Sequence, residues 1–437
     1  MSKVSFIEKI ANFARCLRRR PSMFHIIVDC TRYLFVQFNI FVEKNMGRKI
    51  VIVDLEELQF LPFLLPIVKD IQSRNLNVSF YGSTLRTYMG MMEFNSFNIP
   101  AEKWLTTNWV KRIRECDVFL SAHIHGHGPT DALKINVFHN QPVKYLRYPK
   151  QALLKYDAHF LMGPLQRRQM EQMIAYHAIP EDKIKLYNIG YPKIDDLTKG
   201  GFKRDEILKG MALDTRKKTV LYAPSWDEGL SLREFGVACV QKLIEIDGIN
   251  VLVKLHPASC VPKDNPNFTF YTGGVEWAKI FDPFKNYQNY HFIEGQYLNS
   301  ILAVTDIMIT DVSSVALEFI VLNRPIIFFD CPIFFEHTLS SVYAAYGETM
   351  PDEARTNPMT NAGRNAGLII SDPDGLLASI QECIANPEGM SQERQDLAKQ
   401  LLYNPGCGSE VAGRHICSLL KLPIDESFEC GCRNQQE

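Results

Sequence analysis

The sequence lacks the features that mark most secreted, disulfide-stabilised and nucleic-acid-binding proteins. Its formal net charge is −1, so the chain as a whole has no excess of positive charge to attract nucleic acid. Its start is charged and has neither a long apolar core nor a small-residue cleavage pattern, so we expect no secretory signal. Its 11 cysteines are scattered without paired spacing, which fits reduced thiols better than a disulfide framework. These absences predict a cytoplasmic protein.

The chain also lacks a long uninterrupted apolar run. Residues 23–42 are apolar and aromatic, but Asp29 and Arg32 interrupt them. We therefore expect a buried helix there rather than a membrane span. Residues 5–20 form an amphipathic pattern with a basic face, and two alternatives stay open for it: peripheral contact with the cytoplasmic face of a membrane, or packing on the protein body. We treat residues 1–46 as an N-terminal helical segment.

Short apolar runs alternate with helical patterns over most of the remaining chain. The apolar fraction is 46% and the charged fraction 22%, as in ordinary globular proteins. Strand-like residues 49–53 and 78–81 flank a helical pattern, and the alternation restarts after Lys218. This order predicts βαβ units, parallel sheets and an α/β fold. The expected parts are a Rossmann-like domain over 47–195, a second one over 196–374, and C-terminal helices with a polar tail over 375–437.

Residues 309–319 are the stretch best suited to bind a ligand. A strand pattern ends at Thr310, and a helical pattern begins after Ser313 and Ser314. In open α/β sheets, ligands bind at the carboxyl ends of strands, and a helix start favours phosphate. The alternative is that Asp311 or Ser313 only caps the helix.

Three other predicted strand ends carry side chains that suit group transfer. His139 follows one strand, His256 follows another beside Lys254, and residues 190–195 form a turn between the two halves. One histidine could take a proton from an attacking hydroxyl, and the other could stabilise or protonate a leaving phosphate. The positive charges of Lys254 and Arg324 would balance the negative charge of the phosphate. Each of these residues alone also has a structural explanation.

The ordered set of motifs resembles the CDP-glycerol glycerophosphotransferase family, whose members build teichoic-acid and related capsule backbones. The resemblance covers roughly residues 117–330. The motifs are Phe138-His139-Asn140-Gln141-Pro142-Val143-Lys144, Gly190-Tyr191-Pro192-Lys193-Ile194-Asp195, Tyr222-Ala223-Pro224-Ser225-Trp226, Lys254-Leu255-His256-Pro257, and Thr310-Asp311-Val312-Ser313-Ser314 through Leu322-Asn323-Arg324-Pro325.

The resemblance implies a GT-B-like fold, with two Rossmann-like domains facing a cleft and the nucleotide bound mainly by the C-terminal half. It implies attack of an acceptor hydroxyl on the β-phosphorus of a CDP-activated polyol, with release of CMP. His139 and His256 would be catalytic. The expected donor-binding residues are Asp311, Ser313, Ser314, Lys254, Arg324, Glu318, Pro224 and Ser225. Other expected cleft residues are Lys144, Tyr191, Lys193 and His127.

The sequence departs from the family pattern at Phe138 and Asn140, where the family has tryptophan and glycine. Glu318 lies one helical turn after Ser314, and it is either a ribose ligand, as in related nucleotide-sugar enzymes, or an ordinary surface glutamate. These features leave a second hypothesis open: a GT-B glycosyltransferase or sugar-nucleotide epimerase. A third is a non-enzymatic scaffold, which need not keep both histidines and the intact Asp-Val-Ser-Ser turn.

His123, His125 and His127 alternate in a glycine-containing stretch. Alternating histidines on a strand would face one side and could bind a metal, but neither cysteine nor a close set of carboxylates accompanies them. We favour a substrate-lining or incidental loop and expect neither a metal nor a cofactor. The expected partners are a CDP-polyol donor and a polymer or lipid-linked acceptor, and the sequence gives no oligomeric state.

Overall fold

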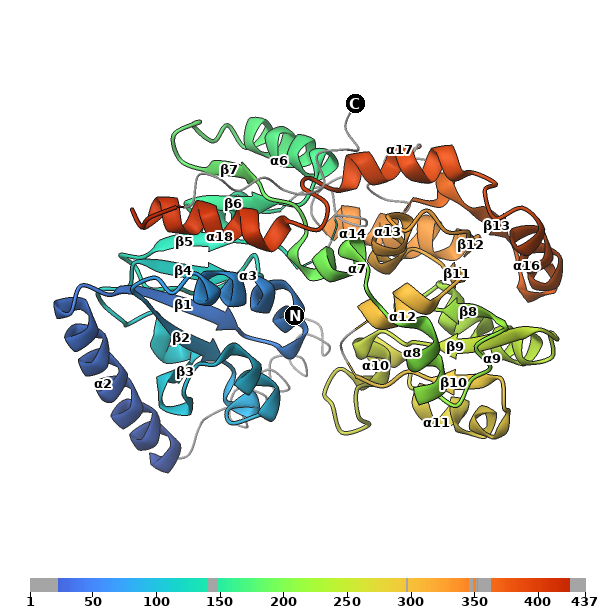
Figure 1. Cartoon of the computed structure of the whole chain (residues 1–437), viewed down its shortest axis with the longest axis horizontal. Coiled ribbons are helices and arrows are strands. Elements are labelled where there is room, and N and C mark those ends of the chain that lie inside the picture. Colours follow the sequence, from blue (N-terminus) through green and yellow to red (C-terminus); the bar gives the residue numbers. More distant parts are fainter. Residues whose placement is uncertain are drawn as a thin grey trace, which may run out of the picture.

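The computed structural model describes residues 23–139, 141, 148–295, 298–345, 349–350, 352 and 363–424. Two parallel sheets lie side by side, each with helices packed against it (Figure 1). The expected α/β fold with two Rossmann-like sheets is therefore observed.

The first sheet has seven strands in the order β3-β2-β1-β4-β5-β6-β7, and every described pairing is parallel. Its central strands are buried on both faces, which explains their continuous apolar sequence. The strands are β1 (Lys49–Leu55), β2 (Val78–Thr84), β3 (Trp104–Thr106), β4 (Val118–Ser121), β5 (Leu133–Asn136), β6 (Ala158–Leu161) and β7 (Lys185–Asn188).

The second sheet has six strands in the order β10-β9-β8-β11-β12-β13, again all parallel. The order reverses direction at β8 and β11, so the carboxyl ends of these two strands form a switch point where ligands bind in such sheets. The strands are β8 (Lys218–Tyr222), β9 (Ile249–Val253), β10 (Tyr290–Phe292), β11 (Ile307–Thr310), β12 (Ile326–Phe329) and β13 (Leu368–Ile370).

Helices connect the strands and cover the faces of both sheets (Figure 1). Those of the first half are α2 (Met23–Asn45), α3 (Leu61–Ser73), α4 (Thr107–Val110), α5 (Lys150–Leu153) and α6 (Pro164–Tyr176). Those of the second half and the link to it are α7 (Asp195–Lys199), α8 (Arg204–Gly210), α9 (Ser231–Ile244), α10 (Phe268–Thr272), α11 (Trp277–Phe281), α12 (Asn299–Val304), α13 (Ser314–Ile320) and α14 (Leu339–Ala345).

The last three helices connect the two halves. α16 (Leu376–Ala385) packs on α9, α17 (Ser391–Leu401) packs on both α13 and α6, and α18 (Gly408–Leu419) returns to pack on α3 of the first half. The breaks between these helices fall at the Pro- and Gly-containing turns 386–389 and 404–406. Figure 1 shows α18 lying across the first half, far in sequence from the strands that it covers.

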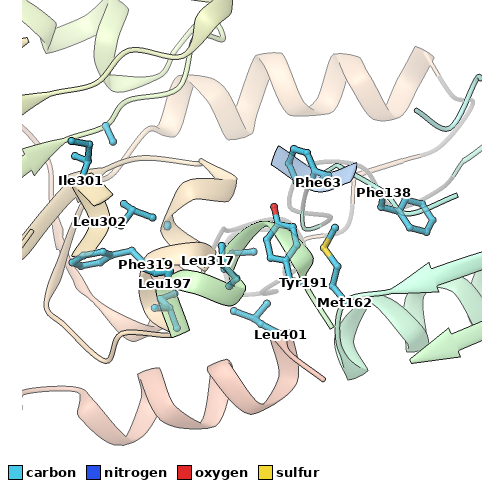
Figure 2. Close-up of a cluster of buried hydrophobic side chains, with 14 of the residues drawn as sticks. Phe63, Phe138, Met162, Tyr191, Leu197, Ile301, Leu302, Leu317, Phe319 and Leu401 are labelled. Atoms are coloured by element: carbon cyan, nitrogen blue, oxygen red, sulfur yellow. The ribbon is translucent and has the colours of Figure 1, made fainter. Parts of the chain in front are cut away.

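Buried apolar side chains from both halves form one continuous cluster at their junction (Figure 2). Tyr191 stands between Leu317 of the second half and Met162 of the first, with Phe63 nearby. The rings of Phe63 and Tyr191 stack with centroids 5.8 Å apart. This packing holds the two halves together at the carboxyl ends of the strands that carry the site residues.

Helix α2 differs from our expectation, because it is not a buried helix. Only its inner face, at Val36 and Ile40, is fully buried. It lies along the outer edge of the first half, on the side away from the second half (Figure 1). Large apolar side chains project from its outer face: Ile26, Ile27, Leu34, Phe35, Phe38, Phe41 and Val42.

Two other expectations concern cysteines and membrane spans. Seven described cysteines carry free thiols, but Cys407 is disulfide-bonded, so our expectation of uniformly reduced thiols is wrong there. Within the part of the chain that the structure describes, no helix combines the length and the apolar character needed to cross a bilayer. The amphipathic pattern over residues 5–20 lies outside the described residues.

Candidate active site

A cavity of about 290 Å³ lies between the two halves, at the carboxyl ends of the strands. The first half contributes Gln59, Pro62, Phe63, His139 and Lys193 to its wall. The second half contributes Ala223, Pro224, Lys254, Leu255, His256, Pro257, Leu298, Ser313, Ser314, Val315 and Glu318. Segments that are far apart in the sequence thus meet around one space, which is large enough for part of a small ligand.

His139 follows β5 and is held in one orientation by the backbone. Its Nδ1 lies 2.9 Å from the carbonyl oxygen of Ala122, to which Nδ1–H donates. In the neutral ring this leaves Nε2 without a proton and able to accept one. Phe60 packs beside the ring with centroids 5.1 Å apart. Burial lowers the pKa of His139 to about 4, so the imidazole is neutral at physiological pH.

The turn that presents His139 contains a strained residue. Phe138 has φ of 56°, a left-handed conformation that is rare for a bulky side chain. The side chain of Asn136 accepts a hydrogen bond from the Phe138 N–H at 3.1 Å, and the Phe138 ring stacks on His159 at 5.4 Å. Packing and this hydrogen bond therefore stabilise a conformation that turns the next residue toward the cavity.

His256 follows β9 and makes the opposite kind of hydrogen bond. Its Nδ1 accepts from the Ala258 N–H at 3.1 Å, at the start of the short turn Pro257–Cys260. The neutral ring therefore carries its proton on Nε2 and acts as a donor there. Lys254 lies on the same cavity wall, and burial, followed by the nearby Lys193, lowers the pKa of its ammonium group. The second half thus supplies a proton donor and a cation.

The serines at the start of α13 face the cavity, and the capping alternative does not hold for them. Ser313 is the N-cap residue, but its side chain makes no capping hydrogen bond. Ser313 and Ser314 both line the cavity. Their hydroxyl groups and the first-turn amides are donors of the kind that phosphate oxygens accept.

Asp311 lies below this turn and supports a neighbouring loop rather than the cavity. It is fully buried, and its carboxylate accepts hydrogen bonds from the Ser225 N–H at 3.0 Å, the Ser231 N–H at 3.1 Å and the Ser231 hydroxyl at 2.7 Å. It therefore holds residues 224–231 next to β11. The structure places neither Asp311 nor the buried Ser225 among the residues that line the cavity.

Glu318 and Lys193 form a buried ion pair between the two halves. The Lys193 Nζ lies 2.6 and 2.7 Å from the two carboxylate oxygens of Glu318, and the Tyr191 hydroxyl donates to one of them at 2.8 Å. The Glu318 side chain is only 2% exposed, so it is not an ordinary surface glutamate. Burial raises the pKa of the Tyr191 hydroxyl, and the neighbouring carboxylate of Glu318 raises it further. The ion pair fixes an ammonium group in the cavity wall.

Four other predicted site residues do not line the cavity or cannot be placed, and one of them is Tyr191, whose hydroxyl donates to Glu318 instead. Arg324 precedes β12, at the opposite edge of the sheet, and its guanidinium donates to the carbonyl oxygens of Ala303 and Thr305 at the end of α12. There the guanidinium interacts favourably with the carboxyl end of a helix. The structure therefore does not support donor binding by Arg324. His127 is exposed on another loop. Lys144 and Asn140 lie outside the described residues.

The sequence analysis missed the part of the wall at the start of α3. Gln59, Pro62 and Phe63 line the cavity, although their segment reads as an ordinary helix in the sequence. The available signal was Pro62 shortly after the carboxyl end of β1, because proline favours the first helical turn and a helix start at a strand end is a common ligand site. Among the residues that the structure describes, no group of three or more His, Cys, Asp or Glu side chains is placed to bind a metal.

Comparison with known families and proteins agrees with the motif order. Residues 125–359 match the family model described as CDP-Glycerol:Poly(glycerophosphate) glycerophosphotransferase. A teichoic acid poly(glycerol phosphate) polymerase of Staphylococcus epidermidis is 25% identical over 254 residues, which are 51% of this chain and 32% of that protein. A teichoic acid glycerol-phosphate transferase of Staphylococcus aureus is 25% identical over 263 residues, 56% of this chain and 57% of that protein. The chain thus spans between about a third and three-fifths of these relatives.

Solved structures with the same fold include that of the wall teichoic acid polymerase TagF, in an H444N variant soaked with CDPG. It has a TM-score of 0.60 and 16% identity, and covers 96% of this chain and 99% of its own. The S. aureus protein MnaA with UDP has a TM-score of 0.53 and 14% identity, and covers 86% of this chain and 98% of its own. The expected GT-B-like α/β fold is thereby confirmed, and at these identities the likeness concerns the fold alone.

Proposed function

The chain belongs to the CDP-glycerol:poly(glycerophosphate) glycerophosphotransferase family, and we propose that it transfers a polyol phosphate from a CDP-activated donor to an acceptor hydroxyl, releasing CMP. The donor would be CDP-glycerol or CDP-ribitol, and the product a cell-envelope or capsule polymer. The observation that carries the proposal is the pair of histidines on one cavity, one with an unprotonated Nε2 and the other with a protonated Nε2.

These two nitrogens fit the two proton positions of the reaction. His139 Nε2 takes the proton from the acceptor hydroxyl as its oxygen forms a bond to the β-phosphorus. The bond between that phosphorus and the bridging oxygen breaks, and CMP leaves with the electron pair. His256 Nε2–H donates to a phosphate oxygen as negative charge moves toward the leaving group. Phosphoryl transfer needs mainly such positioning and charge stabilisation.

The remaining polar residues of the cavity support binding of the diphosphate. Ser313 and Ser314 offer hydroxyl donors, and the ammonium groups of Lys254 and Lys193 offer positive charge on opposite walls. We propose that the domain over 196–374 binds the donor and that the domain over 47–195 presents the acceptor to His139. Glu318 would act by holding Lys193 in place, which leaves its role as a ribose ligand a separate hypothesis.

The direct test is CMP release from CDP-glycerol and CDP-ribitol in the presence of a polyol-phosphate acceptor. We expect release with the wild-type protein and a loss in His139→Ala and in His256→Ala, with circular dichroism showing that both variants remain folded. Wild-type rates in the double variant would rule out the proposal. A thermal-shift comparison with UDP- and CMP-sugars tests donor class, because only a ligand that binds the folded state raises its stability.

The hypothesis of a glycosyltransferase or epimerase loses its structural support. It relied on the altered motif around Asn140, which lies outside the described residues, and on Glu318 as a ribose ligand. Both carboxylate oxygens of Glu318 already accept hydrogen bonds from Lys193. The likeness to MnaA concerns the fold. The family model instead matches the chain over the segment that carries both histidines.

We further propose that the exposed face of α2 rests on the surface of a membrane, which would bring the protein to a lipid-linked acceptor. Leu34 and Phe38 are 61% and 63% exposed, and neighbouring turns add more apolar side chains. Contiguous exposed apolar surface of this kind marks an interaction site, and an amphipathic helix can lie in the plane of the lipid headgroups. The cytoplasmic face is the expected location.

Liposome flotation tests this contact. We expect the wild-type protein to float with vesicles that contain phosphatidylglycerol, and Leu34→Gln/Phe38→Gln to remain at the bottom of the gradient. Leu377→Gln is the matched control, because Leu377 is a 50% exposed leucine on α16 and lies elsewhere in the fold. Equal flotation of all three proteins would contradict the proposed role of α2.

A further inference from the structure

The loop after β4 carries three histidines that the proposed chemistry does not use. It is tightly fixed at its centre, where a Cβ on Gly126 would lie 2.4 Å from the Tyr156 hydroxyl and 2.8 Å from the Ser121 hydroxyl. The Tyr156 hydroxyl also donates to the carbonyl oxygen of His123. Close packing below the loop therefore leaves its side chains at defined places along the edge of the sheet.

The rings of this loop continue the aromatic wall of the cavity outward. Phe60 lies between His139 and His123, with centroid distances of 5.1 and 5.5 Å, and the ring of His125 follows at 5.6 Å from that of His123. His125 and His127 are exposed. An unbroken row of rings thus leads from the base in the cavity to the surface of the first half.

The polar atoms beside this row include both donors and acceptors. His123 Nδ1 lies 2.8 Å from a carboxylate oxygen of Glu56, and these side chains are 29% and 27% exposed. Lys155 donates to the carbonyl oxygen of His125 at 3.2 Å, which places its ammonium group beside the loop. Imidazole N–H and ammonium groups suit phosphate oxygens, while a carboxylate suits hydroxyl groups.

We propose that His123, His125 and His127, together with Glu56 and Lys155, form an acceptor track. It would bind an anionic polyol-phosphate chain so that its terminal hydroxyl reaches His139. Such a chain carries both phosphates and hydroxyl groups, and the track offers N–H and ammonium donors together with one carboxylate acceptor, Glu56. The inference rests on the proposed function, since a polyol-phosphate acceptor is the substrate class which that function requires.

The test separates acceptor binding from donor chemistry. Binding of a fluorescently labelled oligo(glycerol phosphate) to the full chain is measured by anisotropy, without any donor. We expect His125→Ala/His127→Ala to weaken binding about tenfold, the change that loss of a hydrogen bond to a charged group produces. His337→Ala is the matched control, because His337 is an exposed histidine on the second half. The same proteins are then assayed with CDP-glycerol, and we expect a matching rise in acceptor KM with an unchanged donor KM.

The possible results are distinct. Weaker binding in the double variant than in both the wild type and His337→Ala supports the acceptor track. Equal binding by wild type and double variant, or no binding by either, overturns it. Absence of CMP release from CDP-glycerol by the wild-type protein contradicts the proposed function instead, and the anisotropy result still decides whether the track binds the polymer.

Discussion

His139 and His256 face one cavity from two different sheets, and their imidazole rings are fixed by opposite hydrogen bonds. His139 donates from Nδ1 to a carbonyl oxygen, whereas His256 accepts at Nδ1 from an amide. The same residue type thus presents a base on one wall and a donor on the other. The backbone next to each histidine, rather than the histidine itself, therefore assigns its role.

The largest expected effect comes from replacing each histidine by glutamine. At position 256, the glutamine amide can still donate to a phosphate, so His256→Gln should retain more activity than His256→Ala. At position 139, glutamine has no basic nitrogen, so His139→Gln should be as inactive as His139→Ala, with a loss of about 10²- to 10⁴-fold. Initial rates of CMP release measure both. Equal losses in the two glutamine variants would mean that the two walls do not differ in this way.

The next effect concerns the ion pair that joins the walls. Lys193→Met leaves the buried carboxylate of Glu318 without its cation, and we expect the free energy of unfolding to fall by about 3 kcal/mol. Lys199→Met is the control, because the Lys199–Glu410 pair is a surface pair with side chains 47% and 31% exposed, for which about 0–1 kcal/mol is expected. Urea unfolding measures both changes. Similar values for the two lysines would contradict a special role of Lys193.

Asp311→Asn tests whether Asp311 supports the loop or binds the donor. The amide would place an NH₂ group among three donors, so we expect a loss of stability of about 1–3 kcal/mol and a higher donor KM as residues 224–231 move. If the carboxylate instead lay against the donor phosphates, its neutralisation would lower the donor KM. Thermal unfolding and steady-state kinetics of the same variant distinguish these outcomes.

The smallest effect is the pH dependence of the base. The pKa of His139 is lowered to about 4, so its active neutral form persists well below pH 6.5. We expect kcat/KM to show no loss from His139 between pH 7 and pH 5. Stability, by contrast, depends on pH in this range. The unfolded chain takes up this proton near the ordinary pKa of histidine and the folded chain only near pH 4, so stability falls as the pH is lowered between these two values. A decrease of kcat/KM below pH 6.5 that is caused by protonation of His139 would contradict its buried environment.

Local sequence patterns predicted much of the fold, because buried parallel strands and turn-forming residues leave strong signals. The strands β1 and β2 begin at the residues where the sequence patterns begin, and β8 begins at Lys218, where the alternation was expected to restart. The sequence analysis missed the edge strands β3 and β13, because three residues are too few to show a periodic pattern.

Within the site, the sequence identified residues by type and order but could not show which way they face. Asp311 and Ser313 are two residues apart, yet one is buried beneath the turn and the other lines the cavity. Glu318 pairs with a lysine that is 125 residues away along the chain. Such long-range pairings depend on how the two sheets pack, which no local pattern records.

The contact of Asp195 with the start of α18 has a consequence for how the protein can be divided. Asp195 accepts hydrogen bonds from the N–H groups of Gly408 at 2.8 Å and of Ser409 at 2.7 Å, and Gly190 nearby leaves no room for a side chain beside Tyr403. The structural unit around the first sheet therefore includes residues from the end of the described chain. A fragment cut in the link between the sheets would expose the apolar side of α3, and we expect it to aggregate. Co-expression with a segment that carries α18 should restore a soluble fragment.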